Sequence, residues 1–452
     1  MCSKPISASF VSLGCPKNLV DSQIMAGELL ASNIRLAPRP EEADVVIVNT
    51  CAFIEEARRE AFAIIQEVCR LKAVGHCKAV LVAGCLPQRY QAELAERLPD
   101  VDGFIGLDEL DLVPTIVERL ARGEHVLWAI SRTPRKLFAP RFPTLLFTGG
   151  PWAYLRIAEG CRHRCSFCAI PAIRGRMRSR PLSDILREAE QLLAAGVREL
   201  NLIAQDITAY GRDRVDGNDL AAVLRAIGGL GGRFWIRLLY AYPSAINDKL
   251  LHTMANIPQV CHYLDVPIQH SHPDILRAMA RADTIRPLAT LAARARAVMP
   301  DIALRTTCLV GFPGETETRF RHLLEFIRHT EFTHLGVFCF SPEEGTPAAA
   351  MSRRPARRVA EQRRARLMLL QRHIVRRHAV LLLGSETELF LEKPPQAGRK
   401  SWIARSAYQA PEIDGRIFVT DVPPGARPGD FVRARYTAIS GYDLRAVAVS
   451  KV

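Results

Sequence analysis

Three cysteines, Cys161, Cys165 and Cys168, stand at spacings of four and three residues in the stretch CRHRCSFC. One short loop with this spacing can wrap a single compact inorganic centre. Three thiolates fill three corners of a [4Fe–4S] cluster and leave the fourth iron open for chemistry. A zinc ion needs a fourth protein ligand, and none follows nearby. The spacing therefore favours a cluster over a zinc site or buried structural cysteines. We interpret His163, inside the loop, as a solvated side chain or a neighbour of the centre rather than a ligand.

Three further cysteines, Cys15, Cys51 and Cys85, each follow a short apolar run that predicts a β-strand. These runs cover residues 10–13, 45–48 and 79–83. Neighbouring parallel strands lie about 4.8 Å apart and present their ligands at their carboxyl ends. We therefore expect the three thiols to converge on one edge of a sheet and to hold a second cluster with an open iron. The alternative is three buried cysteines, because cysteine is among the most buried residue types.

The elements that must position these thiols alternate along the chain. Helical patterns follow the three strands at residues 18–30, 55–71 and 88–98. This β-α order predicts a parallel sheet with helices on its faces. Gly14 and Gly84 precede two of the cysteines and would let the backbone turn close to a bulky ligand.

The middle of the chain alternates in the same way. Strands are predicted at residues 154–158, 197–203, 234–239, 262–266, 302–310 and 334–340, with helical patterns between them, such as 183–195 and 316–329. Six such units fit a partial, open barrel better than a closed eight-stranded one, with a site at the carboxyl ends of the strands. The CRHRCSFC loop follows the first of these strands and would cap that end.

Other polar and glycine-rich segments fall at the same ends, at residues 204–206, 265–270, 311–315 and 341–346. The glycines of 311–315 permit close approach of a ligand, and a helix that starts near Glu315 offers amides to a carboxylate. The alternative is an ordinary strand-to-helix turn. Beside a cluster loop, we favour ligand contact.

Two arginine-rich segments stay open to more than one interpretation. Residues 174, 176, 178 and 180 are arginines that would share one face of an extended chain; they could grip an anionic substrate or be solvated. Residues 353–378 carry ten arginines and one acid, with an apolar stripe at helical spacing. This predicts a connecting helix that is packed on one side. Its exposed face contacts RNA or an acidic protein surface, or is only solvated.

The last part of the chain is rich in short strands, at residues 387–391, 417–420, 431–438 and 444–449. Such a segment suggests a small barrel of the kind that binds nucleic acid. We therefore divide the α/β chain into residues 1–125, a cluster domain with a parallel sheet; 126–151, a linker; 152–350, a partial (βα)6 barrel; 351–383, a basic connecting helix; and 384–452, a β-barrel.

The composition of the chain indicates its cellular compartment and the charge of its partners. The chain has 452 residues, twelve of them cysteines, and a formal net charge of +14. No apolar run is long enough for a membrane span, and no signal peptide is evident at the start. We expect a reducing, cytoplasmic compartment, where thiols are more often ligands than disulfides. The positive charge indicates an anionic partner such as nucleic acid or the ribosome.

The CRHRCSFC loop resembles the cluster motif of radical S-adenosylmethionine (SAM) enzymes. With the three preceding cysteines and the terminal barrel, nearly the whole chain resembles the radical SAM methylthiotransferases, which end in a TRAM domain. The segments 12–18, 49–54, 204–206 and 410–415 resemble the branch that modifies a ribosomal protein. The tRNA-modifying branch typically has Gln-Met-Asn after the first cysteine and Gly-Gln-Asn after the second barrel strand, where this chain has Pro-Lys-Asn and Ala-Gln-Asp. Cys308 stands where a larger apolar residue is usual, which we expect to alter packing only.

The resemblance implies two [4Fe–4S] clusters and SAM as cofactors. One SAM would bind the open iron at Cys161, Cys165 and Cys168 and yield a 5′-deoxyadenosyl radical, and a second would donate a methyl group. The cluster of Cys15, Cys51 and Cys85 would hold the sulfur to be inserted. Further SAM contacts are expected at Phe167, near the adenine, and at Gly311, Gly314 and Glu315.

The implied substrate is an aspartate of small-subunit ribosomal protein number twelve, methylthiolated at its β-carbon. The implied partners are an electron donor, a sulfur donor and, through the basic segments, the ribosome or RNA, whereas the TRAM domain would bind the ribosomal protein. Two alternatives remain: methylthiolation of a tRNA adenosine, and a non-catalytic iron–sulfur protein that binds RNA or the ribosome and senses redox state.

Overall fold

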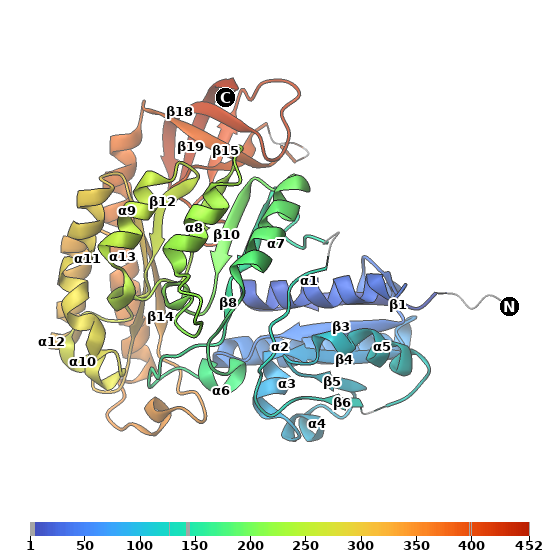
Figure 1. Ribbon diagram of the computed structural model, residues 1–452. Helices are drawn as coiled ribbons and strands as arrows, with labels where there is room; N and C mark the ends of the chain where they lie inside the picture. The colour runs from blue at the N-terminus through green and yellow to red at the C-terminus, as the bar shows by residue number, and fades with distance from the viewer. Residues whose placement is uncertain (1–4, 126, 142–144, 397, 399, 452) are drawn as a thin grey trace. The chain divides into compact units, whose positions relative to one another are not determined.

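The computed structural model describes residues 5–125, 127–141, 145–396, 398 and 400–451. Figure 1 labels its elements in chain order. The chain divides into two compact units. Unit 1 comprises Met1–Phe147, Ala158–Arg180 and Glu343–Ala349, and unit 2 comprises Thr148–Ile157, Pro181–Pro342 and Ala350–Val452. Among the described residues, the helices are all too short or too polar to cross a membrane.

Unit 1 is built on a parallel sheet of six strands in the order β2-β1-β3-β4-β5-β6. The strands are β1 (Ser7–Ser12), β2 (Arg35–Leu36), β3 (Val45–Thr50), β4 (Ala79–Gly84), β5 (Gly103–Ile105) and β6 (Leu127–Ala129). The central strands β3 and β4 are buried along their whole length, as expected for parallel strands covered on both faces. The predicted parallel α/β domain is confirmed.

Helices cover this sheet, and they are α1 (Pro16–Ala31), α2 (Glu55–Val74), α3 (Cys85–Tyr90), α4 (Glu93–Arg97) and α5 (Val113–Ala121). Val46, Val48, Val80 and Val82 pack on one face against residues of α2. The single helix expected over residues 88–98 is wrong, because Gln91 has a φ of +46° and separates α3 from α4. A left-handed residue of this kind cannot continue a helix.

The cysteine-loop segment of unit 1 forms a short hairpin-like structure of its own. Strands β8 (Ala158–Glu159) and β9 (Arg178–Ser179) pair in antiparallel fashion. Between them lie the CRHRCSFC loop and the short helix α6 (Ile170–Arg174). Because the two strands pair, both ends of the loop are held together.

Unit 2 contains a second parallel sheet, in the order β14-β13-β12-β11-β10-β7. Its strands are β7 (Trp152–Arg156), β10 (Glu199–Ile203), β11 (Trp235–Leu238), β12 (Val260–Asp265), β13 (Ala303–Val310) and β14 (His334–Cys339). The helices between them are α7 (Leu182–Ala194), α8 (Leu220–Gly228), α9 (Asp248–Asn256), α10 (Pro273–Ala278), α11 (Ile285–Val298) and α12 (Glu317–Thr330). This open sheet of six strands confirms the predicted partial barrel.

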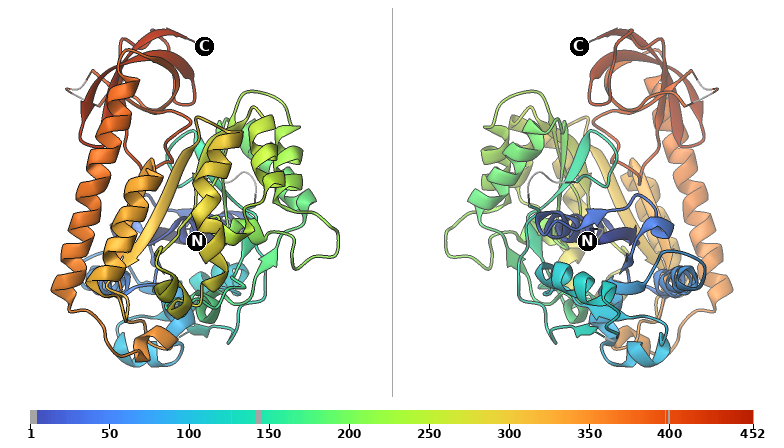
Figure 2. Two further views of the ribbon diagram at one scale, coloured as in Figure 1. Left: turned by 90° about the vertical axis from the view of Figure 1, so that its left-hand side faces the viewer. Right: turned by 90° about the vertical axis from the view of Figure 1, so that its right-hand side faces the viewer.

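The long helix α13 (Arg357–Leu382) runs beside β14 and leads to the terminal barrel (Figure 2). Leu367 and Ile374 are buried on its inner side, as the apolar stripe predicted. The barrel is closed, in the order β15-β16-β17-β19-β18. Its strands are β15 (Glu386–Lys393), β16 (Trp402–Arg405), β17 (Ile417–Thr420), β18 (Phe431–Ser440) and β19 (Asp443–Lys451).

Buried charges join the terminal barrel to the β10 and β11 strands within unit 2. Arg405, at the end of β16, contacts the carboxylate of Glu199, the first residue of β10. Arg237 of β11 donates to the same carboxylate at 2.7 Å, and Glu392 of β15 pairs with Arg405 at 2.7 Å. Two cations therefore face two carboxylates. Such a closed set of charges satisfies groups that would be costly to bury alone.

Candidate functional site

The three N-terminal cysteines lie where the three central strands of unit 1 end. Cys15 caps α1 just after β1, Cys51 follows β3, and Cys85 opens α3 directly after β4. The register pairs Ser12 with Asn49 and Thr50 with Gly84, so the ends of the three strands are level. The predicted convergence of the strand ends is thus present in the structure.

Two glycines permit this convergence, as their positions suggested. Gly14 and Gly84 have φ values of +98° and +95°. A Cβ at Gly14 would come within 2.6 Å of Cys51 Cβ, and one at Gly84 within 2.2 Å of Asn49 Oδ1. Each glycine is needed because a neighbouring strand end approaches its backbone closely.

The three residues are chemically suited to hold an iron–sulfur cluster, because cysteine thiolates are its usual ligands. Among the residues that the structure describes, no group of three or more His, Cys, Asp or Glu side chains could hold a single ion. One ion would need sulfur atoms at about 2.3 Å, whereas a four-iron cluster spreads its ligands more widely. Burial raises the pKa of Cys85 to about 12 and also raises that of Cys51, with Cys15 adding to both. Bound iron would provide the positive charge that these thiolates need.

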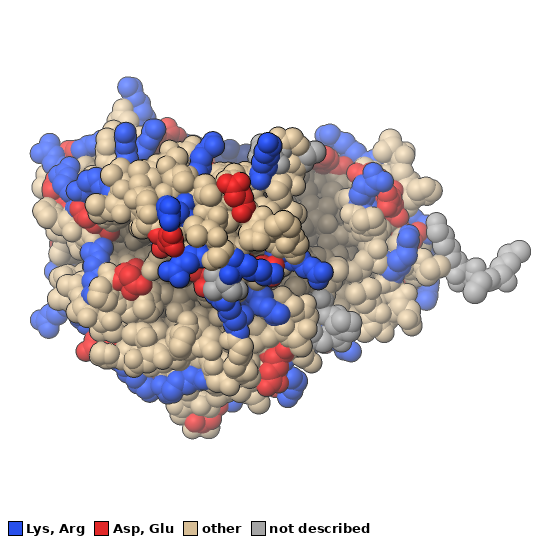
Figure 3. All heavy atoms as spheres, turned by 90° about the horizontal axis from the view of Figure 1, so that it is seen from above, with Lys and Arg blue, Asp and Glu red and all other residues tan. Residues whose placement is uncertain are grey.

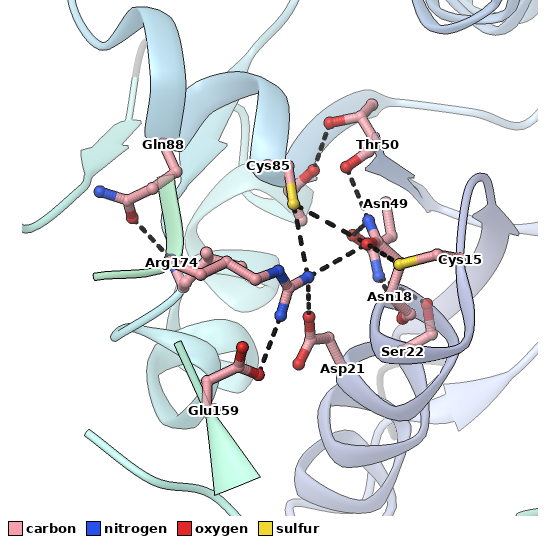
Figure 4. Close-up of polar contacts among 12 residues, drawn as sticks. Cys15, Asn18, Asp21, Ser22, Asn49, Thr50, Cys85, Gln88, Glu159 and Arg174 are labelled. Atoms are coloured by element: carbon pink, nitrogen blue, oxygen red, sulfur yellow. Dashed lines mark hydrogen bonds and ion pairs between the residues drawn. The ribbon is translucent and has the colours of Figure 1, made fainter. Parts of the chain in front are cut away.

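Asn18, in the first turn of α1, lies between the thiols of Cys15 and Cys85 (Figure 4). Its Nδ2 donates to the carbonyl oxygen of Thr50 at 2.7 Å. Its Oδ1 lies 3.5 Å from Cys15 Sγ and 3.8 Å from Cys85 Sγ. Asn49 fixes α1 in turn, because its Nδ2 donates to the Asn18 carbonyl oxygen at 2.7 Å. The Asn18 side chain is therefore oriented by the sheet and touches two of the three thiols.

Arg174 reaches the Cys85 thiol from the other cysteine-bearing segment of unit 1. Its guanidinium donates to Glu159 at 2.9 Å and to Asp21 at 2.9 Å. The same group donates to Asn18 Oδ1 at 3.0 Å and contacts Cys85 Sγ at 3.4 Å. Figure 4 shows the guanidinium between Asp21, Glu159 and the two sulfur atoms.

The second set of cysteines occupies the loop between β8 and α6. The amide of Cys161 donates to Gly175 O at 3.2 Å, and the amide of Cys168 donates to Cys165 O at 3.1 Å. Ser166 is buried, and its carbonyl oxygen accepts from Ala348 N at 2.8 Å. The loop is thus fixed at both ends and in the middle.

A cavity of about 450 Å³ opens beside this loop within unit 1. Arg164, Cys165 and Cys168 line one side, and Arg89, Tyr90 and Glu344 line others. Glu343, buried next to this cavity wall, accepts from Arg89 at 2.9 Å and also pairs with Arg58. The segment Glu343–Ala349 is therefore tied to α2 and α3 by one buried carboxylate.

The 311–315 loop of unit 2 is organised largely by its own contacts. The Glu315 carboxylate accepts from the Gly311 amide and from Arg363 Nη1, the latter at 2.9 Å. The Gly314 amide donates to Arg353 O at 3.0 Å. Helix α12 begins at Glu317 with Thr316 as its cap. A Cβ at Gly311 would come within 2.5 Å of Ala360 Cβ, so close packing against α13 requires this glycine.

His270 lies beside this loop, and its Nε2 is 3.4 Å from Glu315 Oε1. Burial lowers the pKa of His270, and the neighbouring carboxylate opposes that shift only in part. His270 is therefore neutral near pH 7. The SAM contacts expected at Gly311, Gly314, Glu315 and, in unit 1, Phe167 stay predictions.

The interpretation of the four alternating arginines as one shared face is wrong. Arg174 and Arg180 are buried and Arg176 is exposed, because residues 170–174 form α6 and only Arg178 and Ser179 are extended as β9. Asn18, Asp21, Glu159 and Arg174 were not predicted as parts of the site. The signal available in the sequence was the position of Arg174, six residues after Cys168.

Comparisons with known protein families give the same order of domains along the chain. Residues 7–106 match an uncharacterized protein family, UPF0004, residues 155–327 match the radical SAM superfamily, and residues 383–449 match the TRAM domain. Among solved structures, the chain is similar to the radical SAM methyltransferase TsrM from Kitasatospora setae, bound to cobalamin and a [4Fe–4S] cluster. That likeness has a TM-score of 0.53 at 16% identity and covers 76% of this chain and 74% of TsrM.

The cobalamin-dependent S-adenosylmethionine radical enzyme OxsB is similar at a TM-score of 0.54 and 12% identity, over 83% of this chain and 56% of OxsB. At these identities the solved structures support the fold alone. Together with the family matches, fold and cysteine sets define a radical SAM methylthiotransferase with an N-terminal cysteine domain and a terminal TRAM barrel.

Two curated relatives cover nearly the full chain. The ribosomal protein uS12 methylthiotransferase RimO of Syntrophus aciditrophicus is 47% identical over 98% of this chain and 98% of its own length. The protein of the same name from Geobacter sulfurreducens is 45% identical over 96% of this chain and 97% of its own. The chain belongs to the RimO family. Its cofactors are SAM and [4Fe–4S] clusters.

Proposed function

We propose that the protein methylthiolates the β-carbon of an aspartate in ribosomal protein uS12, with one SAM as radical source and another as methyl donor. The observation that carries this proposal is the full-length similarity, 42–47% identical, to relatives named for methylthiolation of uS12. The Pro-Lys-Asn and Ala-Gln-Asp segments support the protein substrate over a tRNA adenosine.

We assign the two cysteine sets to two clusters. Cys161, Cys165 and Cys168 would hold the cluster that binds SAM, and Cys15, Cys51 and Cys85 would hold the cluster that carries the inserted sulfur. When bound, these groups supply a radical able to take hydrogen from unactivated carbon, a sulfur atom and a methyl group. The protein supplies the ligands, the buried network around Asn18 and the fixed loop ends that hold the thiols in place.

Partners and compartment follow from this assignment. The protein needs an electron donor and a sulfur donor, and its substrate places it in the cytoplasm with ribosomes. The net charge of +14 supports contact with the ribosome or its RNA. In the space-filling view toward the β15–β19 barrel, Lys and Arg side chains form several groups with acidic side chains between them (Figure 3). The TRAM barrel is the part that we assign to binding of uS12.

The test is a substrate comparison on anaerobically reconstituted, reduced enzyme with SAM. Purified uS12 and bulk tRNA are incubated separately and analysed by mass spectrometry. The proposal predicts that uS12 gains one methylthio group on a single aspartate. The variant C161A/C165A/C168A, which lacks the expected SAM-binding ligands, serves as the control and should give no product. Modification of tRNA alone would reject the assignment of the substrate.

A further inference from the structure

The charge beside the N-terminal thiols comes from an arginine far away in the sequence. Arg174 is 2% exposed, and its partners Asp21 and Glu159 are 2% and 7% exposed. One guanidinium nitrogen, Nη2, faces Asn18 Oδ1, Asp21 Oδ2 and Cys85 Sγ at 3.0, 2.9 and 3.4 Å. This nitrogen has two hydrogens for three acceptors. The hydrogen bond to sulfur therefore competes with those to the two oxygens.

The competition with the neutral amide oxygen of Asn18 favours sulfur once the sulfur is charged. A thiol is a weak acceptor, whereas a hydrogen bond to an ionised group is roughly twice as strong as one between neutral groups. An arginine side chain keeps its proton in proteins, and Glu159 and Asp21 each accept from the Arg174 guanidinium at 2.9 Å, so the group is a fixed cation. Hydrogen bonds to cluster sulfurs and local net charge are among the features that set the reduction potential of a [4Fe–4S] cluster.

We propose that Arg174 is a positioning residue that donates a hydrogen bond to Cys85 and raises the reduction potential of the N-terminal cluster. This inference rests on the proposed assignment of Cys15, Cys51 and Cys85 as ligands of that cluster. A cation next to the cluster stabilises its more negative, reduced form. Because Arg174 lies six residues after Cys168, the segment that carries one cysteine set also adjusts the site of the other.

A purely structural role is the competing explanation, and Arg58 offers the matched control. Arg58 also lies in unit 1, is largely buried and pairs with a buried carboxylate, that of Glu343. Arg58 contacts Glu343 through its side chain and Ile54 through its amide, and neither partner is a cysteine. Loss of a buried ion pair should lower stability in both Arg58→Gln and Arg174→Gln, whereas the reduction potential should change in the second alone.

The experiment uses the full chain with C161A/C165A/C168A, so that signals arise from the N-terminal cluster alone. Iron content of this parent is measured first; about four irons would support the ligand assignment on which the inference rests, and none would reject that assignment without testing Arg174. The parent, R174Q, R174K and R58Q versions are then titrated with a reductant and followed by electron paramagnetic resonance. Circular dichroism establishes that each is folded.

We expect R174Q to shift the oxidised-to-reduced ratio at a fixed potential about tenfold toward the oxidised form, equivalent to ~59 mV for one electron. R174K keeps the charge but loses the planar fork, so it should shift in the same direction by less. R58Q should match the parent. If R174Q does not fold, R174K decides the question. Folded Arg174 variants with the parent's reduction potential would overturn the proposal.

Discussion

Gly84 is a position in the N-terminal site that tolerates substitution poorly. It ends β4, precedes Cys85 and has φ +95° and ψ −143°. Side chains other than glycine rarely adopt this conformation, which costs about 1–3 kcal/mol. The Asn49 side chain and the Thr50 backbone also occupy the space that a Cβ would take. The position of Cys85 therefore depends directly on the glycine before it.

For Gly84→Ala we expect a loss of stability above about 1–3 kcal/mol and reduced iron binding by the N-terminal cysteines. Chemical unfolding and iron analysis measure the two effects. The control is Gly123→Ala, since Gly123 has φ +91° but open space around its Cβ position. Equal effects of the two substitutions would show that backbone strain alone, and not the contact with Asn49, governs the site.

For single residues, the sequence predicts the proposed cysteine ligands better than it predicts the side chains that contact them. All six proposed cysteine ligands could be located from local spacing or from their place after a strand. Arg174 and Asn18 are 156 residues apart in the sequence, and Arg174 and Cys85 are 89 apart. Their contacts depend on how the segment after β8 folds against the sheet, which no local pattern contains. The network around the thiols could be found only from the structure.

Among the helices and strands, the sequence likewise predicts those with a clear local pattern and misses those without one. The long, apolar strands and the longer helices were predicted because their periodicity is strong. The two- and three-residue strands β2, β5 and β6 were missed, because such short strands carry too few residues to show a pattern. Strand β16, Trp402–Arg405, was missed for the same reason. It ends in Arg405, a charged residue that is buried in an ion pair with Glu199.

The packing of α13 is testable through two leucines on opposite sides of that helix. Leu367 is fully buried, whereas Leu369 is 57% exposed. Leu367→Ala should lower the free energy of unfolding by about 2–5 kcal/mol, because it removes buried methyl groups and leaves a cavity. Leu369→Ala should change it by about 0.5 kcal/mol or less. Similar values for both variants would contradict the described orientation of the helix.

The buried charges around Glu199 define a second element-scale prediction. Burial raises the pKa of Glu199, but the charges of Arg405 and Arg237 lower it by more, so it stays ionised. Glu199→Gln leaves two buried cations with one carboxylate fewer and should cost about 3–5 kcal/mol in thermal or chemical unfolding.

The matched control for Glu199 is Glu388→Gln. Glu388 pairs with Arg233 and likewise links the terminal barrel to the segment before β11, but both side chains are partly exposed. Exposed pairs contribute about 0–1 kcal/mol. If removal of Glu199 costs no more than removal of Glu388, then the buried charges do not hold the TRAM barrel in place.

For the whole molecule, the central feature is that both cysteine sets belong to one compact unit. Unit 1 takes the N-terminal sheet, the CRHRCSFC loop and the short segment Glu343–Ala349 from three separate parts of the chain. The sequence suggested two successive cluster-bearing domains. Unit 1 contains both cysteine sets, and Arg174, which lies in the segment of the second set, contacts Cys85 of the first.

The most direct test of two clusters is the iron and sulfide content of anaerobically purified protein. Two four-iron clusters predict about eight irons in the parent and about four in either triple variant, C161A/C165A/C168A or C15A/C51A/C85A. About four irons in the parent and none in the first variant would contradict the presence of two clusters. The N-terminal cysteines would then be structural, and the proposed site for the inserted sulfur would be lost.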